Sequence, residues 1–414
     1  MTNQSTYKSQ FLPLNFVPKD ISNFGILTYL AALLTCSVVF MSQTMYWYWW
    51  VFGILEVVGF FYFANRQSRL WANIGSKHFQ KNVFWTAVLL RVVVMLFLYW
   101  FHNTMTGQPF TYGAADEIGY HEEAKWMAQT IRDGHFSTYL NYKFVQSNEV
   151  SDAGYPMYLG FVYLLSGDSI IVARLLKCLW GALSCILLYR LGKRNFGEHV
   201  GRLAAILMML EPHFYIYGSL HLKETEMIFM MMLFLERADN LVRSRNFNFS
   251  NIVVVVLLLA SLFTFRTVLG LTAVFSIVLA LLLTSKRVMS WGKRIVFLLV
   301  FGATALYFAG GRIFSEIEAI WELKDDNQSS RMSEIVQTQS YAQYAGAAVF
   351  APMIFTIPFP TMVETEGQET SRLLHGGIVV KNIMSYFCII ALISLLFPIL
   401  PNMNKWRDHV LPGA

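Results

Sequence analysis

The run "VFWTAVLLRVVVMLFLYWF", residues 83–101, decides the fold class of this chain. Its only polar residues are Thr86 and Arg91. A helix of this length crosses the ~30 Å hydrocarbon core of a bilayer, and its backbone groups are satisfied within the helix. The run therefore predicts a transmembrane helix. Because an isolated charge in lipid is costly, we expect Arg91 to pair with an acid inside the bundle.

Comparable apolar runs recur along the whole chain. Hydrophobic residues make up 55% of the sequence, charged residues only 14%, and the mean hydropathy is +0.45. Soluble domains carry about 25% charged residues. The sequence therefore predicts an all-α polytopic integral membrane protein with about ten transmembrane helices. The expected spans are 25–42, 46–64, 83–101, 169–191, 198–216, 225–242, 251–265, 268–285, 295–310 and 378–400.

The Lys and Arg residues gather in short segments between these runs. With the positive-inside rule, those segments and both termini lie in the cytoplasm, and residues 102–167 and 311–376 lie outside. The net charge of +6 then reports topology, and no nucleic-acid partner is expected. Two short apolar pieces, 154–165 and 344–360, are expected as helices or re-entrant segments at the outer interface. The four cysteines fall inside spans and are expected to be small buried apolar residues.

The first outer region contains an acidic stretch, "YGAADEIGYHEEAKWMAQTIRDG", residues 112–134. Its pattern is that of an amphipathic helix lying at the outer membrane surface. One interpretation makes Asp116 the helix N-cap and puts Glu117 in the first turn. The other is chemical, because a carboxylate at the bilayer edge can act as a general base or bind a divalent cation. Residues 121–123, His-Glu-Glu, are expected on the solvated face.

Three further places carry ionisable residues at the predicted outer ends of spans. Lys223 could meet a phosphate as a point charge, and Glu224 could orient it or share a cation with Asp116. The plain alternative is a local ion pair. Arg266, between two spans, is either an interface residue or a phosphate ligand. Arg174, near the outer end of its span, could pair internally or bind phosphate.

The Asp-Glu pair, followed by Tyr120 and preceded by the span that begins "NVFWTAVLLRVVVML", resembles the first outer loop of the GT-C glycosyltransferases. It is most similar to bacterial protein mannosyltransferase-like enzymes and to the aminoarabinose transferases of lipid A. The resemblance extends over about residues 83–285. Downstream it rests on Pro156, Gly167, Arg174, Gly192, Arg194, Phe196, Gly197 and Pro212.

The resemblance implies transfer of a sugar from a polyprenyl-phosphate-linked donor to a lipid, glycan or protein acceptor at the outer face of a bacterial inner membrane. Asp116 would be the base or a ligand of metal and acceptor, with Glu117 beside it. Lys223, Arg266 and Arg174 would bind the donor phosphate. The one cofactor that this interpretation suggests is a divalent cation held by Asp116 and Glu224.

The same resemblance divides the chain into three parts. Residues 1–64 form a cytoplasmic N-terminus and an added two-span hairpin, and 65–310 form the catalytic membrane core. Residues 311–414 form the second outer region, the last span and a cytoplasmic tail.

Two other functions compete with this interpretation. A surface-polysaccharide polymerase or ligase would depend on outer arginines such as Arg312 and Arg331. A transporter or flippase of lipid-linked sugars would place its ionisable groups at mid-membrane on broken helices. In this sequence they gather at the predicted outer edge, which favours surface chemistry. Phosphate-loop and zinc motifs are absent from the sequence, so neither ATP hydrolysis nor a zinc site is expected.

Overall fold

The computed structural model describes residues 26–31, 33–35, 38, 47–111, 115–146, 152–244, 249–284, 380 and 383–386. Every regular element in these ranges is helical, which confirms the predicted all-α class. The expected span 295–310, nearly all of 378–400, the segment 344–360 and the second outer region lie outside the described residues. Arg312 and Arg331 are therefore outside them too.

The helices form two groups. The bundle consists of α2 (Trp47–Leu70), α3 (Ser76–Thr106), α7 (Ile170–Phe196), α8 (Glu198–Leu210), α9 (Pro212–Tyr217), α10 (Glu224–Ser244), α11 (Phe249–Phe265) and α12 (Thr267–Thr284). The outer group consists of α4 (Ala115–Arg132), α5 (Phe136–Asn141), the π-helical turn η2 (Tyr142–Gln146) and α6 (Gly154–Ser166).

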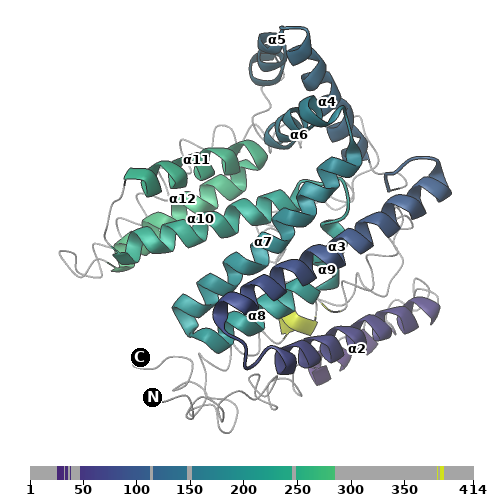
Figure 1. The fold of residues 1–414 in the computed structure, drawn as a ribbon, viewed down its shortest axis with the longest axis vertical. Coiled ribbons are helices and arrows are strands. Elements are labelled where there is room, and N and C mark those ends of the chain that lie inside the picture. Colours follow the sequence, from purple (N-terminus) through teal and green to yellow (C-terminus); the bar gives the residue numbers. More distant parts are fainter. Residues whose placement is uncertain are drawn as a thin grey trace.

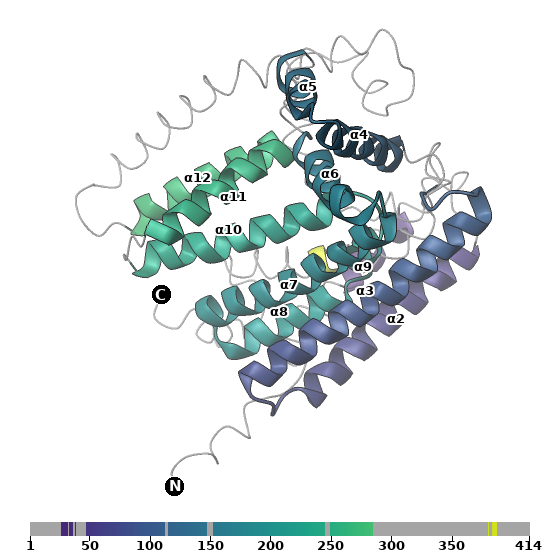
Figure 2. The same cartoon turned by 45° about the horizontal axis from the view of Figure 1, so that its top comes forward.

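Helix α7 lies at the centre of the bundle and packs against α3, α8 and α10 (Figure 1). Helix α2 packs on α8, and α10, α11 and α12 pack together on the other side of α7. The outer group covers one end of the bundle, with α4 and α6 side by side (Figure 2). The expected short outer segment 154–165 is thus a helix, as predicted.

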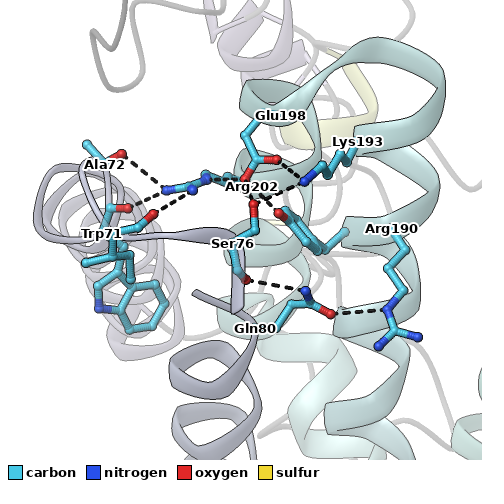
Figure 3. Close-up of polar contacts among 10 residues, drawn as sticks. Trp71, Ala72, Ser76, Gln80, Arg190, Lys193, Glu198 and Arg202 are labelled. Atoms are coloured by element: carbon cyan, nitrogen blue, oxygen red, sulfur yellow. Dashed lines mark hydrogen bonds and ion pairs between the residues drawn. The ribbon is translucent and has the colours of Figure 1, made fainter. Parts of the chain in front are cut away.

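One end of the bundle is held by a partly buried polar network centred on Glu198 (Figure 3). Its carboxylate accepts hydrogen bonds from Tyr189 (2.6 Å) and Arg202 (2.7 Å) and pairs with Lys193 at 2.8 Å. The Arg202 guanidinium also donates to the carbonyls of Trp71 (2.8 Å) and Ile74 (2.7 Å). These carbonyls follow the end of α2 and have no helical donor of their own, so Arg202 ties the α2–α3 turn to the α7–α8 turn.

Contacts at the helix ends group the loops as the charge pattern predicts. Near Glu198, Arg194 pairs with Glu236 at 2.7 Å, so the end of α10 lies beside the end of α7. At the other end of α7, Arg174 donates to the carbonyl of Pro109 at 2.7 Å. The predicted cytoplasmic turns therefore share one end of the bundle and the predicted outer segments share the opposite end. Which end faces the cytoplasm stays a prediction.

Two helices in the described part of the chain, α3 and α7, are long and apolar enough to cross a membrane by length and composition. Helices α11 and α12 are shorter apolar helices. The expected span 198–216 is divided into α8 and α9 because Pro212 has no N–H to continue the helix. Glu211 caps the new helix by accepting from the Phe214 N–H at 2.6 Å. The total of about ten spans remains a prediction.

The expected acid partner of Arg91 is not found among the described residues. Arg91 is buried, and in the described residues its guanidinium meets no carboxylate. It donates to the Ala87 carbonyl at 3.3 Å and to the Cys185 sulfur at 3.8 Å, and it lies over the Phe214 ring at 4.7 Å. The space exists because residue 181 is glycine, where a Cβ would lie 2.6 Å from the Arg91 Nε. A carbonyl, a thiol and an aromatic face replace the acid.

Cys178 and Cys185 are free and buried, as expected for small apolar residues. Cys36 and Cys388 lie outside the described residues.

The close approach of α7 and α8 yields a stability prediction. A Cβ on Gly201 would lie 2.6 Å from both the Lys193 nitrogen and the Tyr189 carbonyl oxygen, which are backbone atoms that cannot move aside. We expect Gly201→Ala to destabilise the protein by about 1–3 kcal/mol. Gly59→Ala, on α2 with open space around it, should stabilise by about 0.5–1 kcal/mol. Thermal unfolding in detergent measures both, and equal midpoints would contradict the packing.

Candidate functional site

Helix α4 presents its two leading acids to different surroundings. It begins at Ala115, so Asp116 lies in the first turn and not at the N-cap as expected. Asp116 is exposed, whereas Glu117 is 1% exposed. Residues four apart share a helix face, so Tyr120 accompanies Asp116 and His121 accompanies Glu117. The adjacent acids therefore have separate roles in the structure.

Glu117 is the anchor between α4 and the bundle. Its carboxylate accepts from the Thr111 hydroxyl at 2.7 Å and from the His221 backbone N–H at 3.4 Å. It also pairs with the Arg174 guanidinium at 3.3 Å, and both side chains are fully buried. A paired buried acid with its oxygens occupied has no free lone pair directed at solvent. This arrangement suits a structural acid more than a base.

Arg174 is a predicted phosphate ligand whose charge is balanced inside the protein. It holds Glu117, donates to the Pro109 carbonyl, and lies 5.9 Å from the centre of the Tyr99 ring. The internal pairing that the sequence left open for this residue is the arrangement in the structure. Its contact with Glu117 ties the start of α7 to the start of α4.

Lys223 lies on the Asp116 side of α4. Its ammonium donates to Asp152 and lies 5.5 Å from the centre of the Tyr120 ring. Burial opposes its charge, yet the hydrogen bonds to Asp152 and Tyr120 hold the pKa of Lys223 above its ordinary value. Lys223 therefore carries a positive charge on the same side of α4 as the exposed Asp116. Its carboxylate partner is Asp152, a residue that the sequence did not single out.

The acids that follow Lys223 behave differently from each other. One oxygen of Glu224 is buried and has no hydrogen-bond partner among the described residues. Glu226 is buried and pairs with Lys177 of α7 at 3.5 Å, while Lys177 also donates to the Leu220 carbonyl at 3.0 Å. Sequence reasoning missed Lys177, although an ionisable residue inside an apolar run was a usable signal.

Arg266 is exposed at the turn between α11 and α12. The preceding Phe265 packs on Tyr155 of α6 with ring centres 6.2 Å apart. Arg266 therefore lies at the same end of the bundle as the outer helices, as the predicted topology requires. The structure does not bring its side chain into a contact with Lys223 or Asp116.

The expected solvated stretch 121–123 is only partly solvated. Glu122 is exposed and pairs with Lys125 at 3.2 Å, as expected. The prediction is wrong for His121, because its Nδ1 lies 2.7 Å from the Tyr163 hydroxyl. The prediction is wrong for Glu123 as well, because its carboxylate accepts a hydrogen bond from the Tyr139 hydroxyl at 2.8 Å. Both turn inward because α6 and α5 pack over that face of α4.

The described residues contain no group of three or more His, Cys, Asp or Glu side chains arranged to hold a metal ion. Any cation at this site would therefore have to complete its coordination with groups from outside the described residues.

Comparison with known families decides the class of protein. Residues 154–309 match the family model described as dolichyl-phosphate-mannose-protein mannosyltransferase. Over this segment the chain is similar to that family. The family is one of GT-C membrane glycosyltransferases, so the resemblance inferred from the sequence is confirmed. No curated protein matches the chain, and no solved structure does either.

The mannosyltransferase match covers fewer than half of the 414 residues. It includes Arg174, Lys223 and Arg266, and it begins after Asp116 and Glu117. The match therefore supports a membrane enzyme of the glycosyltransferase type. The roles of the two leading acids depend on the geometry of α4.

The anchor yields the second prediction. Glu117→Gln removes the charge that balances Arg174 and leaves a buried guanidinium without a counterion, so we expect a loss of about 3–5 kcal/mol of folding stability. Glu122→Gln changes an exposed acid on the same helix, with a side chain 61% exposed, and should change stability by less than about 0.5 kcal/mol. Thermal unfolding in detergent compares the two variants. If Glu117→Gln is as stable as Glu122→Gln, the Glu117–Arg174 ion pair is not needed for folding stability.

Proposed function

We propose that this protein transfers mannose from a polyprenyl-phosphate-linked donor to a hydroxyl group of an acceptor protein at the outer face of the membrane. The mannosyltransferase family match supports the choice of donor and of a protein acceptor. The observation that carries the assignment of residues is the division of α4. Asp116 is exposed beside a protonated lysine, whereas Glu117 is buried and neutralised by Arg174.

In the proposed reaction Asp116 is the general base. Its carboxylate takes the proton of the acceptor hydroxyl as that oxygen attacks C1 of mannose. The bond between the acceptor oxygen and C1 forms, the bond between C1 and the phosphate oxygen breaks, and the lipid phosphate leaves with the electron pair. An exposed carboxylate in the first turn of α4 can reach an acceptor approaching from outside.

Lys223 and Arg266 are the proposed ligands of the departing phosphate. Lys223 is held in its charged form by Asp152 and Tyr120 and lies on the same side of α4 as Asp116. Arg266 is exposed at the same end of the bundle and can bind phosphate through two parallel hydrogen bonds. Arg174 contributes indirectly, because it fixes Glu117 and therefore the start of α4.

A divalent cation is compatible with two of the residues present. Asp116 is open to solvent, and Glu224 has a buried oxygen with no partner among the described residues. Magnesium commonly binds through one or two carboxylates and completes its shell with substrate phosphate oxygens and water. When bound, such a cation would neutralise charge on the leaving phosphate.

Removal of the proposed base should abolish most of the activity. We expect Asp116→Asn to lower kcat for mannose transfer by about 10²–10⁴-fold, because the amide cannot accept the proton. The assay follows transfer from dolichyl-phosphate mannose in membranes or proteoliposomes. Glu122→Gln, an exposed acid on the same helix, is the matched control and should retain full activity.

Full activity of Asp116→Asn would refute the assignment of the base. Chelation separates the remaining possibilities, because a cation-dependent enzyme loses transfer in EDTA and regains it with magnesium. Transport of the donor across vesicles without any transfer would instead favour a flippase.

Removal of the lysine charge should weaken donor binding. We expect Lys223→Met to raise KM for dolichyl-phosphate mannose by about tenfold or more, because a charge-assisted hydrogen bond to the phosphate is lost. Lys125→Met is the control, since the Lys125 side chain is 41% exposed and pairs only with the exposed Glu122 in the described contacts. An unchanged KM for Lys223→Met would remove Lys223 from the donor site.

A further inference from the structure

A tyrosine hydroxyl joins two histidines next to the Glu117 anchor. The Tyr163 hydroxyl of α6 lies 2.7 Å from Nδ1 of His121 on α4 and 3.1 Å from Nε2 of His221. His221 belongs to residues 218–223, which connect α9 to α10. The ring of Phe110 lies against both imidazoles, with ring centres 5.3 Å and 5.9 Å away. We name these three polar residues, His121, Tyr163 and His221, the support chain.

The support chain is made of neutral groups. A phenol has one O–H to donate, so it donates to one imidazole and accepts from the other. If both histidines were protonated, both ring nitrogens would be donors and the phenol proton would have no acceptor. Burial lowers the pKa of His121, with Lys125 adding to the effect, and burial lowers the pKa of His221 further, with Arg174 and Lys177 adding to it. The hydrogen-bond count and the surroundings of the two imidazoles therefore both indicate neutral histidines.

The connection 218–223 carries two groups that bear on the active site. The backbone N–H of His221 binds the Glu117 carboxylate, and Lys223, two residues later, faces Asp152 and Tyr120. The His221 ring is held by Tyr163, with the two rings nearly parallel at 8°. The position of Lys223 relative to Asp116 therefore depends on how firmly the ring of His221 is held.

We propose that the support chain His121–Tyr163–His221 is a positioning device that fixes residues 218–223 and so places Lys223 for the donor phosphate. The inference rests on the proposed function for its effect on catalysis. None of the three side chains is proposed to touch substrate; they act through the backbone of the connection. The support chain adds α6 to the elements that define the site, beyond the acids of α4 and the lysine itself.

The charges around the support chain oppose its protonation overall. On α4, Lys125 disfavours and Glu122 favours a charged His121, while Asp168, beyond α6, is occupied by Arg132 at 3.1 Å. Around His221, the cations of α7 and His121 itself disfavour the charged form. The groups that face the two imidazoles are Glu122, Lys125, Asp168, Arg174 and Lys177.

The support chain is therefore complete at neutral pH and weakens in acid. A free histidine takes up a proton at about pH 6.5. Since both folded-state pKa values lie lower, the displaced connection binds protons before the folded one does. Stability of the connection is full above about pH 6.5 and declines as pH falls from there toward the lowered folded values.

Tyr163→Phe tests the proposal, because it removes only the joining hydroxyl. The expected result is a KM for dolichyl-phosphate mannose raised by about five- to tenfold, with a smaller change in kcat. The decline of kcat/KM in acid should also become shallower, since the histidines are no longer coupled to the connection. Hydrogen exchange of the purified full chain in detergent should be faster at the amides of residues 218–223.

Tyr158→Phe is the matched control. Tyr158 lies on the same helix and its hydroxyl accepts from the Trp180 indole N–H at 2.8 Å, so its removal costs a comparable hydrogen bond elsewhere. It should leave KM, the pH profile and exchange at 218–223 unchanged. His121→Gln, which can still hydrogen-bond to Tyr163, should retain more activity at neutral pH than His121→Leu.

The outcomes separate the two proposals. If Tyr163→Phe matches Tyr158→Phe in KM, pH profile and exchange, the positioning role is overturned, whatever Asp116→Asn does. If Asp116→Asn is fully active or the wild-type chain transfers no mannose, the proposed function fails. In that case faster hydrogen exchange at residues 218–223 in Tyr163→Phe would still show that the support chain holds the connection in place.

Discussion

The buried ion pair between Glu117 and Arg174 is the interaction on which the outer half of this protein depends. It joins the first turn of α4 to the N-terminal part of α7, the helix around which the bundle packs. Neither charge is exposed to solvent, so each needs the other to offset the cost of its burial. The pair fixes the start of α4, and therefore fixes where the neighbouring Asp116 faces outward. An acid that does no chemistry can in this way determine where the chemistry takes place.

The same separation between support and reaction extends through the rest of the site. One face of α4 meets the support chain and Arg174, and these groups contact one another or Glu117 inside the protein. The adjacent face carries Asp116 and Tyr120 beside Lys223, where charge remains open to a ligand. Helical geometry makes this possible, because neighbouring residues on a helix point about 100° apart. The membrane bundle supplies a rigid base, held at its far end by Glu198 and Arg202.

Much of the architecture was predictable from the sequence because apolar runs and basic segments report how each part of the chain meets lipid and water. The expected helices coincide closely with α10, α11 and α12, the span 83–101 lies inside the longer α3, and the segment 154–165 is a helix in the outer group. The family was predictable from the order of the Asp-Glu pair, the prolines and the glycines, and the match over 154–309 confirms it. What failed were the statements about partners. Arg91 meets no acid among the described residues, Lys223 is held by Asp152, and His121 turns inward.

By itself, therefore, the sequence determined the helical class, the membrane setting of the chain, the family and the residues of interest. These properties depend on local composition and on the order of motifs, which a single chain displays directly. Only the tertiary structure decided which of two adjacent acids is buried and which is exposed, and which carboxylate holds Lys223. The physical reason is that a side chain's charge and availability depend on its surroundings. For Glu117 those surroundings come from residues 57 and 104 positions away along the chain.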